Sequence, residues 1–106
     1  MKQELLVPPI AEADPNAIEV VRVWVAKGGQ HVSINVGAWP NPEAWGIVLA
    51  DLAGHLANAY EQEAGLKAEE TMRKITDLLL AELTNPTDTP RGKVQNTRRP
   101  HRRGQG

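Results

Sequence analysis

The side chains best suited to chemistry in this chain are His31, Ser33, Asp51 and His55. His31 and Ser33 lie two residues apart in a valine-rich stretch, so an imidazole and a hydroxyl would project from one face of a strand, as in half of a nucleophilic site. Positions two apart on a strand are nevertheless separated by about 7 Å. No acidic residue can be placed beside His31 to orient it. An ordinary solvated strand face is the favoured interpretation, and a small-molecule enzyme is the weakest of three hypotheses.

Asp51 and His55 are one helical turn apart, a spacing that can bring a carboxylate and an imidazole to one metal ion. A stable zinc site needs three or four protein ligands, and the chain has no cysteine. It also has no Walker loop, dinucleotide fingerprint, zincin motif or calcium loop. We therefore predict no catalytic residue, no metal site and no cofactor.

A β-hairpin is the clearest local signal. Residues 17–26 and 30–36 are rich in valine and isoleucine, and Gly28-Gly29 between them accepts the positive φ angles of a primed turn. If Lys27 opposes Gln30, then Val25 opposes Val32, Val23 opposes Ile34 and Val21 opposes Val36, which makes one face aliphatic. The other face carries the candidate interface or ligand residues Arg22, Trp24, His31, Ser33 and Asn35. Trp24 is the candidate anchor of an interface there, with simple packing under the N-terminal segment as the equal alternative.

Two helices follow the hairpin. Asn41 can cap a helix that begins at Pro42, and Gly65 can end it in the left-handed conformation. Its apolar stripe comprises Trp45, Val48, Leu49, Leu52, Leu56, Ala59 and Tyr60, and beside it runs a strip of small residues, Gly46, Ala50, Ala53, Gly54 and Ala57. We expect this small-residue strip to pack on the sheet or on a second subunit. A second helix is predicted over residues 67–83.

The predicted fold class is therefore α+β, an antiparallel hairpin packed against two helices. Residues 5–7 could add a short N-terminal edge strand. The expected organisation is an extended N-terminal segment (1–16), a single ββαα domain (17–84) and a disordered basic tail (85–106). The helices present more apolar surface than one hairpin can cover, and from this we infer a homodimer.

Charge is divided along the chain. Residues 1–83 hold six basic and twelve acidic side chains, a net charge of −6, whereas residues 84–106 hold six basic side chains and one acidic, a net charge of +5. The arginines Arg98, Arg99, Arg102 and Arg103 could neutralise about four phosphates. The tail has no aromatic residue for stacking on bases, so any nucleic-acid contact would be weak and non-specific.

Several short motifs resemble a family of short, uncharacterised bacterial proteins classed as a domain of unknown function. The motifs are Pro8-Pro9, Ala13-Asp14-Pro15-Asn16-Ala17, Val23-Trp24-Val25, Gly28-Gly29-Gln30-His31-Val32 and Ala44-Trp45-Gly46-Ile47. The resemblance covers roughly residues 5–83 and leaves out the basic tail. It implies a compact single domain and brings no activity or functional residue with it.

The favoured function is a non-enzymatic protein-interaction module, homodimeric and open to an unidentified protein partner. The alternative is a nucleic-acid-associated accessory protein that uses the basic tail. No apolar run approaches the ~20 residues that span a bilayer, and the first residues do not form a signal peptide. We expect a cytoplasmic protein with no membrane partner.

Overall fold

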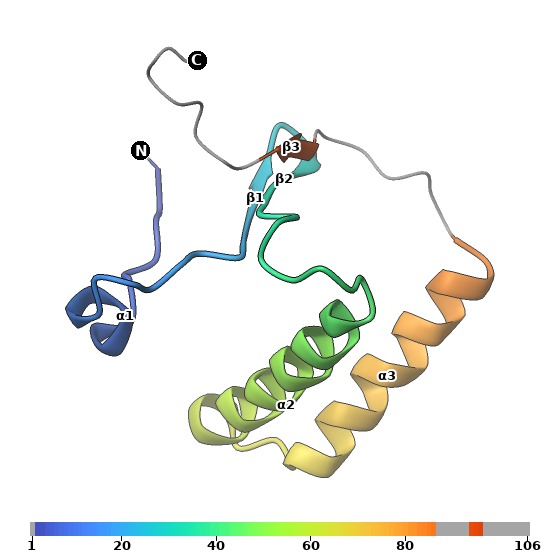
Figure 1. The fold of residues 1–106 in the computed structure, drawn as a ribbon. Coiled ribbons are helices and arrows are strands. Elements are labelled where there is room, and N and C mark those ends of the chain that lie inside the picture. Colours follow the sequence, from blue (N-terminus) through green and yellow to red (C-terminus); the bar gives the residue numbers. More distant parts are fainter. Residues whose placement is uncertain (1, 87–93, 97–106) are drawn as a thin grey trace. The chain divides into compact units, whose positions relative to one another are not determined.

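The computed structural model describes residues 2–86 and the backbone of residues 94–96 (Figure 1). Its elements are α1 (Pro9–Ala13), β1 (Val21–Ala26), β2 (Gly29–Ile34), α2 (Ala44–Ala64), α3 (Ala68–Thr84) and β3 (Val94–Asn96). They fall into two compact units, divided between Ala38 and Trp39. The first unit holds α1 and the three strands, and the second holds α2 and α3. The predicted α+β content, a β-hairpin and two long helices, is confirmed. That the helices cover the hairpin stays a prediction.

The hairpin turns at Lys27 and Gly28, with φ angles of 51° and 75°. The predicted turn at Gly28-Gly29 is wrong by one position, because Gly29 is already the first residue of β2 and pairs with Ala26. The pairs are therefore displaced by two residues from the predicted ones, so that Val23 opposes Val32 and Val21 opposes Ile34. Side chains alternate along a strand with a period of two, so this displacement keeps every side chain on its predicted face. Val23 and Ile34 share one face, as expected.

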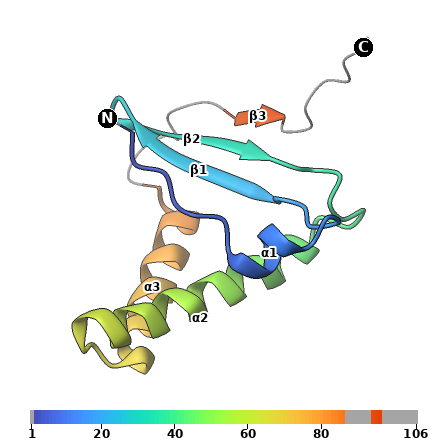
Figure 2. The ribbon, with the colours of Figure 1, turned by 90° about the vertical axis from the view of Figure 1, so that its left-hand side faces the viewer.

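The third strand comes from the C-terminal part of the chain. In Figure 2 the strands lie side by side with β2 in the middle, and β3 runs parallel to it with Val32 opposite Val94. The edge strand considered for residues 5–7 is not formed, and Leu5 and Leu6 are each 93% exposed. The disorder predicted for residues 85–106 falls largely outside the described residues. Within them, residues 94–96 pair with β2 as β3.

The N-terminal segment contains a helix where an extended chain was expected. Proline is favourable at the first helical position because its fixed φ angle already suits a helix. The N–H that proline lacks would have no partner within the helix at this position. Pro9 takes this position in α1, and the N–H groups of Ala11 and Glu12 donate to the carbonyl oxygen of Pro8 at 3.0 and 2.9 Å. The N–H of Asn16 then donates to the Asp14 carboxylate at 2.8 Å, forming a turn after the helix.

The start of α2 also differs from its prediction. Pro42 belongs to a preceding turn in which the N–H of Trp45 donates to the Pro42 carbonyl at 3.0 Å, and Asn41 makes no side-chain cap. The predicted end at Gly65 is confirmed, since its φ is 73° and its N–H donates to the Glu61 carbonyl at 3.0 Å. Helix α3 lies within one residue of its predicted bounds.

One residue of the small-residue strip, Gly54, lies at the contact between α2 and α3. Ala57 on α2 and Thr71 on α3 are the two buried residues of the described chain, 3% and 8% exposed. A Cβ built on Gly54 would lie 3.8 Å from Cε of Met72, so the helices approach closely here. The expectation that this strip packs on the sheet or on a second subunit is corrected for Gly54, which faces α3. Small side chains allow that close approach because they add little volume between the two backbones.

Candidate interaction surface

Four of the five candidate residues lie together on one face of the hairpin. Arg22 opposes Ser33, and Trp24 opposes His31 in the next pair on that face. Trp24, His31 and Ser33 are half-buried. The surface is therefore mixed, with one large aromatic ring between polar groups, as the sequence predicts.

Asn35, the fifth candidate, lies one residue beyond the end of β2 and has a structural role. Its N–H donates to the carbonyl oxygen of Val20 at 3.0 Å, and its side-chain oxygen accepts from the N–H of Gly37 at 3.1 Å. These bonds extend the hairpin by one pair and turn the chain out of the sheet.

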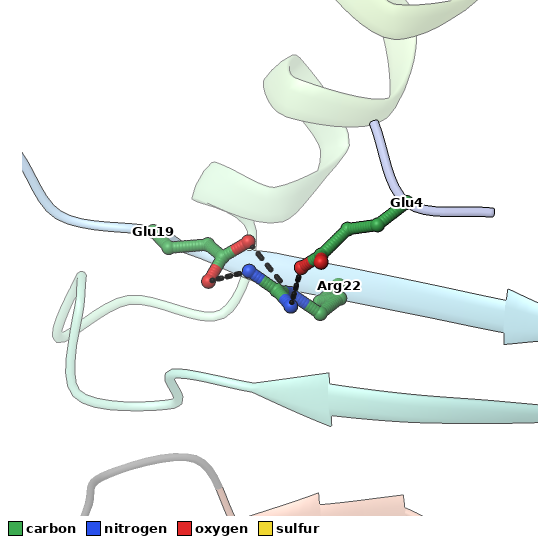
Figure 3. Close-up of polar contacts among 3 residues, drawn as sticks. All are labelled: Glu4, Glu19 and Arg22. Carbon is green, nitrogen blue, oxygen red and sulfur yellow. Dashed lines mark hydrogen bonds and ion pairs between the residues drawn. The ribbon is translucent and has the colours of Figure 1, made fainter. Parts of the chain in front are cut away.

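Arg22 is held by two carboxylates (Figure 3). Its Nε donates to Glu19 at 3.0 Å, and a terminal nitrogen donates to Glu4 at 2.9 Å. The hydrogen bond to Glu19, followed by the charge of Glu19, raises the pKa of Arg22 above its ordinary value. A raised pKa keeps the guanidinium charged at every physiological pH, and any stabilisation it brings is lost only in strong alkali. An anionic ligand would have to displace both carboxylates.

His31 helps to close the end of the hairpin. Its Nε2 lies 3.2 Å from the carbonyl oxygen of Ala26, and in the tautomer that carries its proton on Nε2 this nitrogen donates to that oxygen. In that tautomer Nε2 cannot act as a general base toward Ser33.

Asp51 and His55 are both exposed on α2, one turn apart as predicted. In the part of the chain that the structure describes, no three His, Asp or Glu side chains gather closely enough to hold a metal ion. Within the same residues, no helix combines the length and the apolar character needed to cross a membrane.

Trp39 and Trp45 pack against each other where the chain leads into α2. Their ring centroids are 5.3 Å apart, and the ring planes meet at 84°, an edge-to-face arrangement. Both rings are half-buried. They fix the approach to the helix, which is the packing role expected for them.

Large apolar side chains remain exposed in both units. On α2, the predicted stripe includes Leu49, Leu52, Leu56 and Tyr60, each between 42% and 57% exposed. On β1, Val25 is 81% exposed. Sequence reasoning identified the stripe but missed the backbone edge of β1, which becomes visible only once the true register is known.

The candidate nucleic-acid residues Arg98, Arg99, Arg102 and Arg103 lie outside the described residues.

A family model places the chain in a family. It belongs to the family described as a domain of unknown function (DUF5076), whose model matches residues 4–87, so the resemblance found in the sequence is confirmed. No curated protein matches the chain. A similar solved structure is described as "Structure of a putative pyruvate dehydrogenase from the photosynthetic bacterium Rhodopseudomonas palustrus CGA009". It is 34% identical with a TM-score of 0.67, and the match covers 86% of this chain and 93% of that one.

Proposed function

We propose that this protein is a small protein-interaction module that acts as a homodimer. The observation that carries the proposal is the imbalance between buried and exposed apolar groups. Ala57 is the one buried apolar residue of the described chain, whereas Val25, Leu49 and Leu52 are among many large apolar side chains that stay about half exposed or more. Apolar surface left exposed in this way is typical of association sites.

The chemistry of the described residues supports binding more than catalysis. Arg22 is engaged by two carboxylates, and Nε2 of His31 lies 3.2 Å from a backbone carbonyl oxygen. The name of the similar solved structure concerns that protein, and we carry over its fold without a dehydrogenase activity. The proposal includes a cytoplasmic location, as expected from the sequence.

The oligomeric state tests this proposal. Size-exclusion chromatography with light scattering, run on the full chain over a concentration series, should give a mass approaching twice the 11.6 kDa of one chain. The mass should fall toward that of one chain on dilution if the dimer is weak. A constant single-chain mass at concentrations near 1 mM, where even a dimer with a Kd of about 1 mM is substantially populated, contradicts the proposal.

A further inference from the structure

The outer edge of β1 carries backbone groups that point away from the sheet. Asn35 N–H bonds the Val20 carbonyl, so residues 20 and 35 form a hydrogen-bonded pair. Such pairs alternate with non-hydrogen-bonded ones along an antiparallel ladder. The N–H and C=O groups of Val21, Val23 and Val25 therefore point to the outer edge. Within the described part of the chain, these groups have no partner.

This edge has few of the features that usually protect an edge strand. Natural sheets block such edges with proline, charged side chains (especially lysine), a bulge, a very short strand or a covering segment. The six residues of β1 contain no proline or lysine and pair without a bulge, and the charge of Arg22 is paired with Glu4 and Glu19. Val23 and Val25 are 53% and 81% exposed. The opposite edge of the sheet, in contrast, is already occupied by β3.

We propose that β1 pairs with β1 of a second copy, antiparallel and centred on Val23. This inference rests on the proposed homodimer and names its contact. In a two-fold symmetric antiparallel pair, a residue whose backbone N–H and C=O point to the outer edge must lie opposite another such residue. Two opposed residues also have their side chains on the same face of the sheet. The register centred on Val23 places Val21 opposite the partner's Val25 and Val23 opposite the partner's Val23. No other register pairs all three valines.

The same register brings the two candidate side chains of β1 together. Arg22 lies opposite the partner's Trp24 in a non-hydrogen-bonded pair, where opposed side chains are closest. A guanidinium beside an indole ring is a favourable cation–π pair. The symmetry forms this pair twice. Two three-stranded sheets become one continuous sheet, and its outer edges are no longer β1.

Cysteine cross-linking tests the register, because the chain has no cysteine of its own. In a hydrogen-bonded antiparallel pair the two Cα atoms are about 5.5 Å apart, a separation that a disulfide can span. Val23→Cys should give a covalent dimer under mild oxidation. Val21→Cys is the matched control, because its two copies would lie four residues apart, about 13 Å. Cross-linking of Val21→Cys as readily as Val23→Cys overturns the register.

Charge substitution tests the contact itself. Val23→Lys and Val23→Glu each place two like charges opposite one another, so each variant alone should lose the dimer, and an equal mixture should restore it. Recovery on mixing shows that both variants fold. A Val23→Lys variant that remains dimeric, or a dimer lost only through Leu52→Lys and Leu56→Lys on α2, overturns this inference and leaves the proposed homodimer intact. A wild-type chain that stays monomeric overturns both.

Discussion

Lys27 holds a backbone conformation that suits other residue types better. Its φ of 51° is the only positive value at a residue other than glycine in the described chain. The left-handed region costs most L-residues about 1–2 kcal/mol, and asparagine followed by glycine is the preferred pair for a type I′ turn. We expect Lys27→Asn to raise the free energy of unfolding by about 1 kcal/mol, measured by urea denaturation of the full chain.

Lys27→Ala is the matched control for this substitution. It removes the same charge and keeps the unfavourable φ, so it should bring no stabilisation. If the alanine variant gains as much as the asparagine variant, the effect arises from the charge, and the conformational explanation is wrong.

Arg22 shows what sequence reasoning can and cannot reach for a single residue. Alternation along β1 was enough to place it on the mixed face of the hairpin. Its partners were not predictable, because Glu19 precedes the strand and Glu4 lies in an irregular segment 18 residues away. Such contacts depend on the path of the connecting chain, which carries no periodic pattern.

At the scale of elements, two small residues of α2, Gly54 and Ala57, should respond differently to a larger side chain. Gly54 has room for a methyl group, since the added Cβ would make an ordinary 3.8 Å contact with Met72. Alanine in place of glycine inside a helix is favourable by about 0.5–1 kcal/mol, so Gly54→Ala should stabilise the protein by that amount. Ala57 is 3% exposed, and Ala57→Leu should destabilise it by about 1–3 kcal/mol through overpacking.

Gly46→Ala provides the control for the helix preference, because an added Cβ there has nothing within 4 Å. Thermal and urea denaturation of the three variants should place Gly54→Ala and Gly46→Ala above the wild type and Ala57→Leu below it. A destabilised Gly54→Ala variant would mean that the helices approach more closely than the structure shows.

Elements with a strong local signal were predictable, and the details that depend on tertiary pairing were not. Alternation fixed both hairpin faces, and Gly65 fixed the end of α2. The turn was predicted one position too late because either Lys27-Gly28 or Gly28-Gly29 could form it. Only the pairing of the strands decides between these two dipeptides. The start of α2 was misplaced because Pro42 suits a turn as well as a first helical residue. No local pattern indicated that residues 94–96 would pair with β2.

The whole molecule combines exposed apolar side chains with a net negative charge in residues 1–83 and a net positive charge in residues 84–106. Pairing through β1 would leave the α2 stripe of Leu49, Leu52, Leu56 and Tyr60 open to the hairpin or to another protein. It would also double the number of basic tails in each assembly. Two tails of net charge +5 in one particle would strengthen attraction to any polyanion, because linked sites act at a high effective concentration.

This charge supports the second candidate function, weak and non-specific nucleic-acid binding through the tail. We expect the full chain to be retained on single-stranded RNA at low salt. Replacing Arg98, Arg99, Arg102 and Arg103 by glutamine should abolish retention, whereas replacing Lys67, Arg73 and Lys74 should not. Release of about four counterions predicts that affinity falls roughly 600-fold for a tenfold rise in salt. Equal retention of both variants, or a salt-independent affinity, would exclude the tail as a nucleic-acid contact.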